Sequence, residues 1–279
     1  MLLLENCSLR PVRRPNIKSP VTIIIGIKCK TGIVVACDSR TTDPQGYVDD
    51  TAMKLHVIAF NDGNSGIVAE AGHAEFSSRA VEMIAQLAKD RPLNDYRSLA
   101  SCAEQAVSEL KQKIREQFKG SGEELQRHLE AYSFELMLIH YWEGKPLIFT
   151  MRSEFGMATK KDKNYCAIGC GWILADFIIS RIDLQDIATG GGIWTAVYAV
   201  EEIKKFDSRC GGKTRSAIAR FVDGKSIAQI SLDLGMDEAI KEAQDFSEKA
   251  KTEWKAVVED RINTVIARRT KNPVKPSTV

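Results

Sequence analysis

The sequence predicts a four-layer α+β sandwich, in which two antiparallel sheets face each other and a layer of helices covers the outer side of each sheet. Short runs rich in Ile and Val, bounded by turn residues, are typical of strands. Longer segments with apolar residues on one helical face come in pairs. The order is strands, two helices, strands, two helices and strands, with no internal repeat. One large domain accommodates this order, and we place it at residues 22–232.

The first half of the domain begins with strands. Turn signals such as Asn61-Asp62-Gly63-Asn64 separate four apolar runs, which predict strands over 22–27, 32–40, 54–60 and 65–72. Apolar residues then recur at helical spacing and predict helices over 74–89 and about 99–118. Gly120-Ser121-Gly122 ends the second of these helices.

The second half repeats the scheme. Strands are predicted over 133–141, 147–151 and 165–168, and helices over 172–182 and 193–206. A hairpin of strands over 216–222 and 225–230 closes the domain. Asp223-Gly224 supplies the hairpin turn. Gly190-Gly191-Gly192 lacks the lysine and threonine of a phosphate-binding loop, so we expect a plain loop before the helix at Ile193.

Three segments flank the domain. Residues 1–21 contain Pro11, Pro15 and Pro20 among basic residues and read as an extended, propeptide-like lead-in. Residues 233–268 predict a charged amphipathic helix, whose apolar positions include Trp254 and offer a subunit contact. Residues 269–279 predict a flexible tail.

Composition excludes several classes of function. With 39 basic and 37 acidic residues the net charge is +2, which favours neither nucleic acid nor a membrane surface as a partner. No apolar run is long enough to span a bilayer, and the N-terminus does not resemble a signal peptide. Seven cysteines without a short repeated spacing argue against a disulfide framework or a zinc site. We expect a cytoplasmic protein without metal or organic cofactor.

Thr22, Asp38 and Lys54 follow one another at intervals of 16 residues. Each lies at the end of a predicted strand, where neighbouring backbones can bring a hydroxyl, a carboxylate and an ammonium together. A hydroxyl is a weak nucleophile until a base accepts its proton, so this combination predicts a nucleophile with the means to activate it.

The order of elements and the motifs resemble the β-subunit family of the proteasome, within the N-terminal-nucleophile hydrolases. The resemblance runs from Thr22 to about Ile230. It identifies Thr22 with the family's nucleophilic threonine, which self-cleavage exposes, and Asp38 and Lys54 with its strand-end aspartate and catalytic lysine. Gly72 matches the glycine whose N–H forms the oxyanion hole.

Two further motifs carry the resemblance. Gly169-Cys170-Gly171 is similar to the family's Gly-Ser-Gly, and Asp207-Ser208-Arg209-Cys210-Gly211-Gly212 is similar to Asp-x-x-Ser-Gly-Gly, with cysteine in place of serine in both. The resemblance implies that Cys170, Asp207 and Cys210 support the amine of Thr22. It also implies that Thr41 and Glu70 contact the substrate, and an acidic Glu70 favours Lys or Arg before the cleaved bond.

The resemblance implies a threonine-type endopeptidase that acts on peptides or unfolded proteins, within a homo-oligomeric ring or related assembly or with other proteasome-like subunits. A free α-amine has a pKa of about 7.7–8.0 and can accept the hydroxyl proton. A nearby Lys54 ammonium lowers that pKa further, and the Gly72 N–H meets the developing oxyanion.

Simpler interpretations exist for each residue. Thr22 alone is a β-branched strand residue, Asp38 could cap a turn, and Cys170 and Cys210 could be small buried apolar residues. Val21, where the family has glycine, is stiff and crowds the carbonyl that self-cleavage attacks. An uncleaved, inactive structural subunit and an amidase acting on a small molecule therefore stay open as alternatives.

Overall fold

The computed structural model describes residues 22–42, 48–118 and 120–231. The expected N-terminal extension with Val21, the C-terminal helix with Trp254 and the tail lie outside these residues.

The first sheet has the strand order β10-β1-β2-β11-β12, and all its neighbours are antiparallel. Its strands are β1 (Ile23–Cys29), β2 (Gly32–Asp38), β10 (Tyr165–Gly169), β11 (Thr214–Val222) and β12 (Lys225–Ser231). The central strands β1 and β2 are rich in Ile and Val, and none of their residues is exposed. This pattern arises because both faces of the sheet are covered.

The second sheet has the order β5-β6-β7-β8-β9 and is also antiparallel throughout. Its strands are β5 (Leu55–Ala59), β6 (Ser65–Gly72), β7 (Phe134–Trp142), β8 (Lys145–Arg152) and β9 (Ala158–Lys160). A short ribbon of β3 (Thr41–Thr42) and β4 (Val48–Asp49) stands apart from both sheets.

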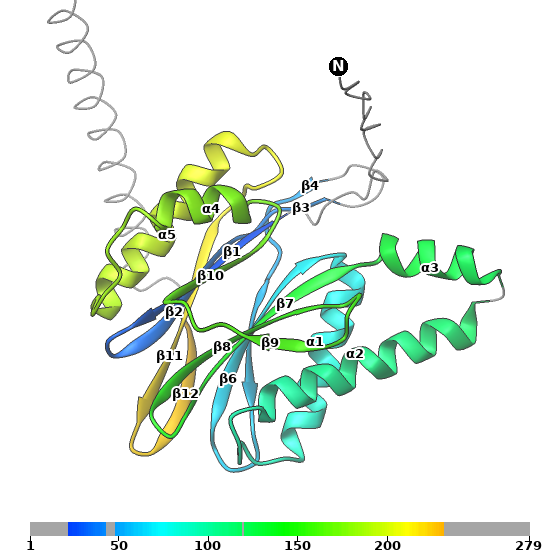
Figure 1. The fold of residues 1–279 in the computed structure, drawn as a ribbon, viewed down its shortest axis with the longest axis horizontal. Helices are drawn as coiled ribbons and strands as arrows, with labels where there is room; N and C mark the ends of the chain where they lie inside the picture. The colour runs from blue at the N-terminus through cyan, green and yellow to red at the C-terminus, as the bar shows by residue number, and fades with distance from the viewer. Residues whose placement is uncertain (1–21, 43–47, 119, 232–279) are drawn as a thin grey trace, which may run out of the picture.

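Helices cover the outer faces of both sheets (Figure 1). The helices are α1 (Ala74–Lys89), α2 (Ser98–Gln117), α3 (Gly122–Ala131), α4 (Trp172–Ile179) and α5 (Thr189–Phe206). α1 and α2 pack on the second sheet, while α4 and α5 pack on the first. Between the sheets, side chains such as Ile24, Val35, Ala69 and Ile139 form the third apolar cluster. Four layers of secondary structure result, and the predicted fold class is confirmed.

The structure departs from the sequence prediction in a few elements. α3 begins at a capping box, in which Ser121 and Glu124 bond each other's backbone N–H groups, although Gly120 and Gly122 had indicated only a break. The expected loop at 190–192 is wrong, because α5 begins at Thr189. Gly192 is needed there for packing, since a Cβ would lie 2.2 Å from Cys29 Sγ.

The strand registers bring three of the predicted site residues, Thr22, Asp38 and Cys170, to one end of the first sheet's strands. Ile24 pairs with Cys37, so Thr22 and Asp38 lie at the same end of the β1–β2 pair. Ile23 pairs with Gly169 on the other side of β1, which places Cys170 beside Thr22. Among the described residues, no helix combines the length and apolarity needed to cross a membrane.

Candidate active site

Thr22, Asp38 and Lys54 meet in a buried polar cluster. The Thr22 hydroxyl donates to Asp38 Oδ1 at 2.5 Å, and the Lys54 ammonium donates both to Thr22 Oγ1 and, at 2.9 Å, to Asp38 Oδ1. Thr22 and Asp38 are 0% exposed and Lys54 is 4% exposed. The structure thus brings together the three residues that the 16-residue intervals singled out.

Backbone groups fix the orientation of both charged side chains. Asp38 Oδ1 accepts the N–H of Ile23 at 3.0 Å, and its Oδ2 accepts the N–H of Gly211 at 2.9 Å. Lys54 Nζ also donates to the carbonyl of Arg40 at 2.5 Å. Buried charges are tolerated when they are paired and hydrogen-bonded in this way, so the carboxylate and the ammonium hold each other in place.

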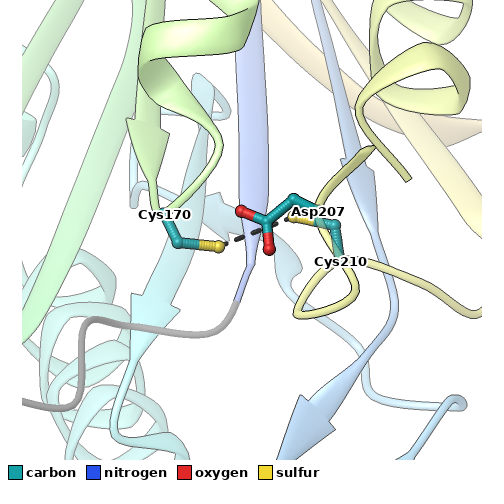
Figure 2. Close-up of side chains that lie close together, drawn as sticks. All are labelled: Cys170, Asp207 and Cys210. Atoms are coloured by element: carbon teal, nitrogen blue, oxygen red, sulfur yellow. Dashed lines mark hydrogen bonds between the residues drawn. The ribbon is translucent and has the colours of Figure 1, made fainter. Parts of the chain in front are cut away.

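Cys170 and Cys210 form a second cluster, which reaches the backbone of Thr22 through Cys170. Cys170 follows β10 and its thiol donates to the carbonyl of Thr22 at 3.2 Å. The two sulfurs are 3.6 Å apart (Figure 2). Their hydrogen bond lowers the pKa of the Cys170 thiol and, with burial, raises that of Cys210 far above its usual range.

Asp207, at the C-terminal end of α5, points its carboxylate toward the two sulfurs in Figure 2. Arg209 binds that carboxylate through Nε and Nη2, each at 2.9 Å, and this bond lowers the pKa of Asp207. The nitrogen of Thr22, which these residues were expected to support, belongs to the peptide bond with Val21 in the 279-residue chain.

Two glycines are dictated by sterics, one at the end of β6 and one beside Thr22. Gly72 ends β6 with a φ of +121°, and a Cβ there would lie 2.6 Å from the Cα of Phe134. Gly169 has a φ of +90°, and a Cβ there would lie 2.3 Å from the carbonyl oxygen of Thr22. Sequence reasoning assigned Gly72 to the oxyanion hole but gave Gly169 no role of its own, although Gly169 lets β10 approach Thr22.

The two expected substrate contacts have local partners. Glu70 is 5% exposed, and its carboxylate lies 2.8 Å from His56 Nε2 and 3.3 Å from Ser78 Oγ, on the side of the sheet that α1 covers. The hydroxyl of Thr41, in β3, donates to the carbonyl of Asp49 at 3.4 Å.

Residues that sequence reasoning missed brace the loop after β2. Arg40 forms a two-point ion pair with Asp50, at 2.7 and 2.9 Å, and Ser39 donates to the carbonyl of Asp50. Lys213 N also donates to Ser39 Oγ at 2.7 Å, which ties this loop to the Gly211-Gly212 segment. The Asp38-Ser39-Arg40 motif was the available signal, but only the contacts of Arg40 with Asp50 and with the carbonyl of Ser208, at 3.1 Å, explain why an arginine stands there.

The cluster has the composition required to activate a hydroxyl. An ammonium in contact with Oγ1 stabilises the alkoxide-like oxygen that forms when the hydroxyl loses its proton, and the carboxylate holds that ammonium. Burial strengthens both interactions by excluding water.

Comparisons with known proteins agree with this fold. The family model described as proteasome subunit matches residues 21–217. No curated protein matches the sequence. Among solved structures, Anbu, the ancestral β-subunit, from Yersinia bercovieri is 16% identical, with a TM-score of 0.64 over 84% of this chain and 97% of its own.

Two other Anbu structures are similar. Anbu from Hyphomicrobium sp. strain MC1 is 16% identical, with a TM-score of 0.60 over 83% of this chain and 97% of its own. The Anbu complex from Pseudomonas aeruginosa, described as a helical assembly, is 14% identical, with a TM-score of 0.63 over 92% of this chain and 99% of its own. At such identities the structures show the shared fold, while the family model covers most of the chain. The chain belongs to the proteasome subunit family.

Proposed function

We propose that this protein is a threonine-type endopeptidase in which Thr22 Oγ1 attacks the scissile carbonyl. The observation that carries the proposal is the buried contact of the Thr22 hydroxyl with both the Lys54 ammonium and the Asp38 carboxylate. A structural threonine needs no buried ion pair beside it. A buried ion pair often stabilises a fold no more than apolar residues of similar volume would, so we assign this pair a role in the chemistry.

The general base in this proposal is the α-amine of Thr22 after removal of residues 1–21. Lys54, next to the hydroxyl, disfavours a second positive charge and so keeps the amine available as a base near neutral pH. The amine takes the Thr22 hydroxyl proton, Oγ1 forms an ester with the acyl part of the substrate, and the proton passes to the leaving amine. The N–H of Gly72 stabilises the tetrahedral oxyanion, and water then hydrolyses the ester.

Removal of residues 1–21 is a necessary step in this mechanism. Thr22 has no exposed surface in the full chain, and its nitrogen is engaged in a peptide bond. Cleavage of the Val21–Thr22 bond frees the amine. The stiff Val21 opposes this step, so we expect it to be slow or to depend on assembly, and its failure would leave the inactive subunit considered below.

The proposal extends to the substrate class. Peptide or unfolded protein binds along Thr41, and Glu70 selects Lys or Arg before the cleaved bond. A buried carboxylate beside His56 and Ser78 is positioned by its neighbours, as a specificity determinant has to be.

We further propose that the active form is a homo-oligomer. α4 leaves three large apolar side chains, Trp172, Ile173 and Phe177, between 48% and 63% exposed. Such a patch on one short helix is typical of a subunit contact. The Pseudomonas aeruginosa relative, described as a helical assembly, makes a second copy of this chain the expected partner.

Sedimentation of the purified chain tests the assembly. We expect the double substitution Ile173→Asp/Phe177→Asp to reduce the oligomer to smaller species. Phe155→Asp serves as the control, because Phe155 is 74% exposed but lies after β8, away from α4. Equal dissociation of both variants, or none, would contradict the role of α4.

We place the protein in the cytoplasm, where thiols stay reduced. Within the described part of the chain, six cysteines are free thiols, including the adjacent Cys170 and Cys210.

The second candidate function is an uncleaved, inactive subunit that contributes a wall to an assembly. The full burial of Thr22 and the two cysteines at the family's serine positions favour it. A thiol is a weaker hydrogen-bond partner than a hydroxyl and supports an amine less well.

Intact-mass spectrometry combined with a peptidase assay separates the two candidates. The endopeptidase proposal expects a wild-type chain that begins at Thr22 and hydrolyses peptides, and a Thr22→Ala variant that stays uncleaved and inactive. A wild-type chain that retains residue 1 in its assembled form and hydrolyses no peptide would favour the inactive subunit.

A further inference from the structure

Three side chains of metal-ligating type converge next to Thr22 from two separate segments. Cys170 lies in the turn between β10 and α4, while Asp207 and Cys210 belong to the loop between α5 and β11. The two sulfurs and a carboxylate oxygen all lie within 4.8 Å of one another. Figure 2 shows the sulfurs directed toward each other, with the carboxylate of Asp207 beside the line that joins them.

The separation of the sulfurs fits a shared metal ion. Two thiolates bound to tetrahedral zinc at about 2.3 Å each are about 3.8 Å apart. Cys170 Sγ and Cys210 Sγ are 3.6 Å apart, so an ion can enter with little movement of either side chain. A disulfide would require the sulfurs to approach to about 2.05 Å, a much larger displacement.

We propose that Cys170, Asp207 and Cys210 form a binding site for a divalent transition metal of the zinc class. Two thiolates and one carboxylate select Zn²⁺ over Mg²⁺ or Ca²⁺, which bind through oxygen ligands. Binding forms two metal–sulfur bonds and releases two thiol protons to water. Three protein ligands leave the fourth tetrahedral position to water or another small donor.

The charge of the surroundings suits a divalent ion. Arg209 contributes one positive charge beside the Asp207 carboxylate, so two thiolates, the carboxylate and the guanidinium leave two negative charges. A divalent cation neutralises them. Each carboxylate oxygen has two lone pairs, so Asp207 can bind the ion while it keeps its bonds to Arg209.

The backbone holds the ligands in advance of binding. Cys210 N donates to the carbonyl of Asp207 at 2.9 Å, and the next N–H, that of Gly211, donates to Asp38 at 2.9 Å. Cys170 stands between Gly169 and Gly171, where added Cβ atoms would meet Thr22 and Ile203 at 2.3 and 2.8 Å. Preformed ligand positions reduce the entropy cost of binding.

The site is coupled to Thr22 through Cys170. The Cys170 thiol donates to the Thr22 carbonyl, and a metal-bound thiolate has no proton with which to keep this bond. Metal binding therefore changes the support of Thr22, although the site itself does not depend on Thr22 being a nucleophile.

Titration of the full-length protein with Co²⁺, in the presence of a reductant that does not bind metals, tests the proposal. We expect one equivalent of Co²⁺ to produce a sulfur-to-cobalt charge-transfer band with the strong visible bands of four-coordinate cobalt, and Zn²⁺ to abolish them. Cys170→Ser and Cys210→Ser should each weaken binding at least tenfold. Asp207→Asn should weaken binding but keep the charge-transfer band.

Cys102→Ser is the matched control, because Cys102 is a free thiol as buried as Cys210 but lies among α1 and α2. It should bind Co²⁺ as the wild type does. Should a site variant fail to fold, alkylation of the wild type replaces it, with Zn²⁺ expected to slow the modification of Cys170, the more exposed thiol of the site. Equal modification of Cys170 with and without Zn²⁺ would contradict the site.

Three results would overturn the proposal. One is a titration without a charge-transfer band, and another is a band that reaches its wild-type intensity at the wild-type Co²⁺ concentration in both cysteine variants. The third combines two observations: a Cys170–Cys210 disulfide forms in air, and the reduced protein binds no Co²⁺. This result would assign the two cysteines to redox chemistry instead.

Discussion

Lys54 and Asp38 form a buried ion pair that joins the two sheets. Lys54 immediately precedes β5 of the second sheet and Asp38 ends β2 of the first, and Lys54 Nζ lies 2.9 Å from Asp38 Oδ1. The Thr22 hydroxyl contacts both groups. The ion pair that connects the two sheets is therefore also in contact with the proposed nucleophile.

Lys54→Met tests how strongly the structure depends on this pair. The substitution leaves the Asp38 carboxylate buried without its cation, which typically costs about 3–5 kcal/mol. We expect the free energy of unfolding, measured with urea, to fall by that amount, and peptide hydrolysis to be lost.

The double variant Asp38→Asn/Lys54→Met separates stability from catalysis. It removes both charges, so it should regain much of the lost stability but none of the activity. Recovery of hydrolysis in the double variant would show that the pair acts on the fold alone.

Gly169→Ala should displace Thr22. The added Cβ would lie 2.3 Å from the carbonyl oxygen of Thr22, and the φ of +90° already disfavours a side chain. Gly224→Ala is the control, because Gly224 has a φ of +77° but no heavy atom within 4 Å of the added Cβ. We expect Gly224→Ala to cost about 1–2 kcal/mol of unfolding free energy and Gly169→Ala clearly more. Equal costs would mean that the contact with Thr22 is easily relieved.

Glu70→Gln tests the proposed substrate preference. Removal of the negative charge should lower kcat/KM for fluorogenic peptides with Lys or Arg before the cleaved bond about tenfold or more, and leave apolar residues at that position unaffected. A wild-type enzyme that prefers apolar residues there would defeat this assignment and leave Glu70 as a partner of His56 and Ser78.

His140 predicts a pH dependence of stability. Its side chain is fully buried, Nε2 lies 3.1 Å from the carbonyl of Tyr96, and Nδ1 has no partner among the described residues. Burial lowers the pKa of His140 from 6.5 to about 4. The unfolded chain thus binds a proton that the folded chain excludes, and stability falls as the pH drops from 6.5 toward 4, by about 3 kcal/mol.

Urea unfolding across this pH range measures the effect. In His140→Gln the free energy of unfolding should fall less between pH 6.5 and 4 than in the wild type, by up to about 3 kcal/mol. His128→Gln, on α3, is the control and should keep the wild-type dependence. A His140→Gln profile that parallels the wild type would show that His140 does not control the decrease.

Periodicity predicted the elements well where apolar residues face one core. α1 occupies the predicted residues 74–89, since its helical spacing reflects the face it packs on the second sheet. α3 has no buried residue, so its apolar pattern was weak, and the capping box at Ser121 was the only signal. The start of α5 was missed because glycine disfavours helix, whereas packing against Cys29 requires it at Gly192.

The site was predictable only in part. Thr22, Asp38 and Lys54 could be found because strand ends and motifs mark them. The motifs also assigned Cys170, Asp207 and Cys210 to the surroundings of Thr22, but the contact between the two sulfurs was not predicted, because 40 residues separate the cysteines and no local spacing reveals it. They meet because the turn after β10 and the loop before β11 both reach the end of the β1–β2 pair, where Cys170 contacts Thr22 and Gly211 contacts Asp38. A search for short metal-ligand spacings misses such a cluster.

The most direct test of the central claim is to trap the nucleophile with a peptide that carries an electrophile and to map the adduct by mass spectrometry. The account predicts one adduct per chain, on Thr22 at a newly formed N-terminus, and none in the Thr22→Ala variant. Modification of Cys170 instead of Thr22, or hydrolysis of peptides by a chain that still carries residues 1–21, would contradict it.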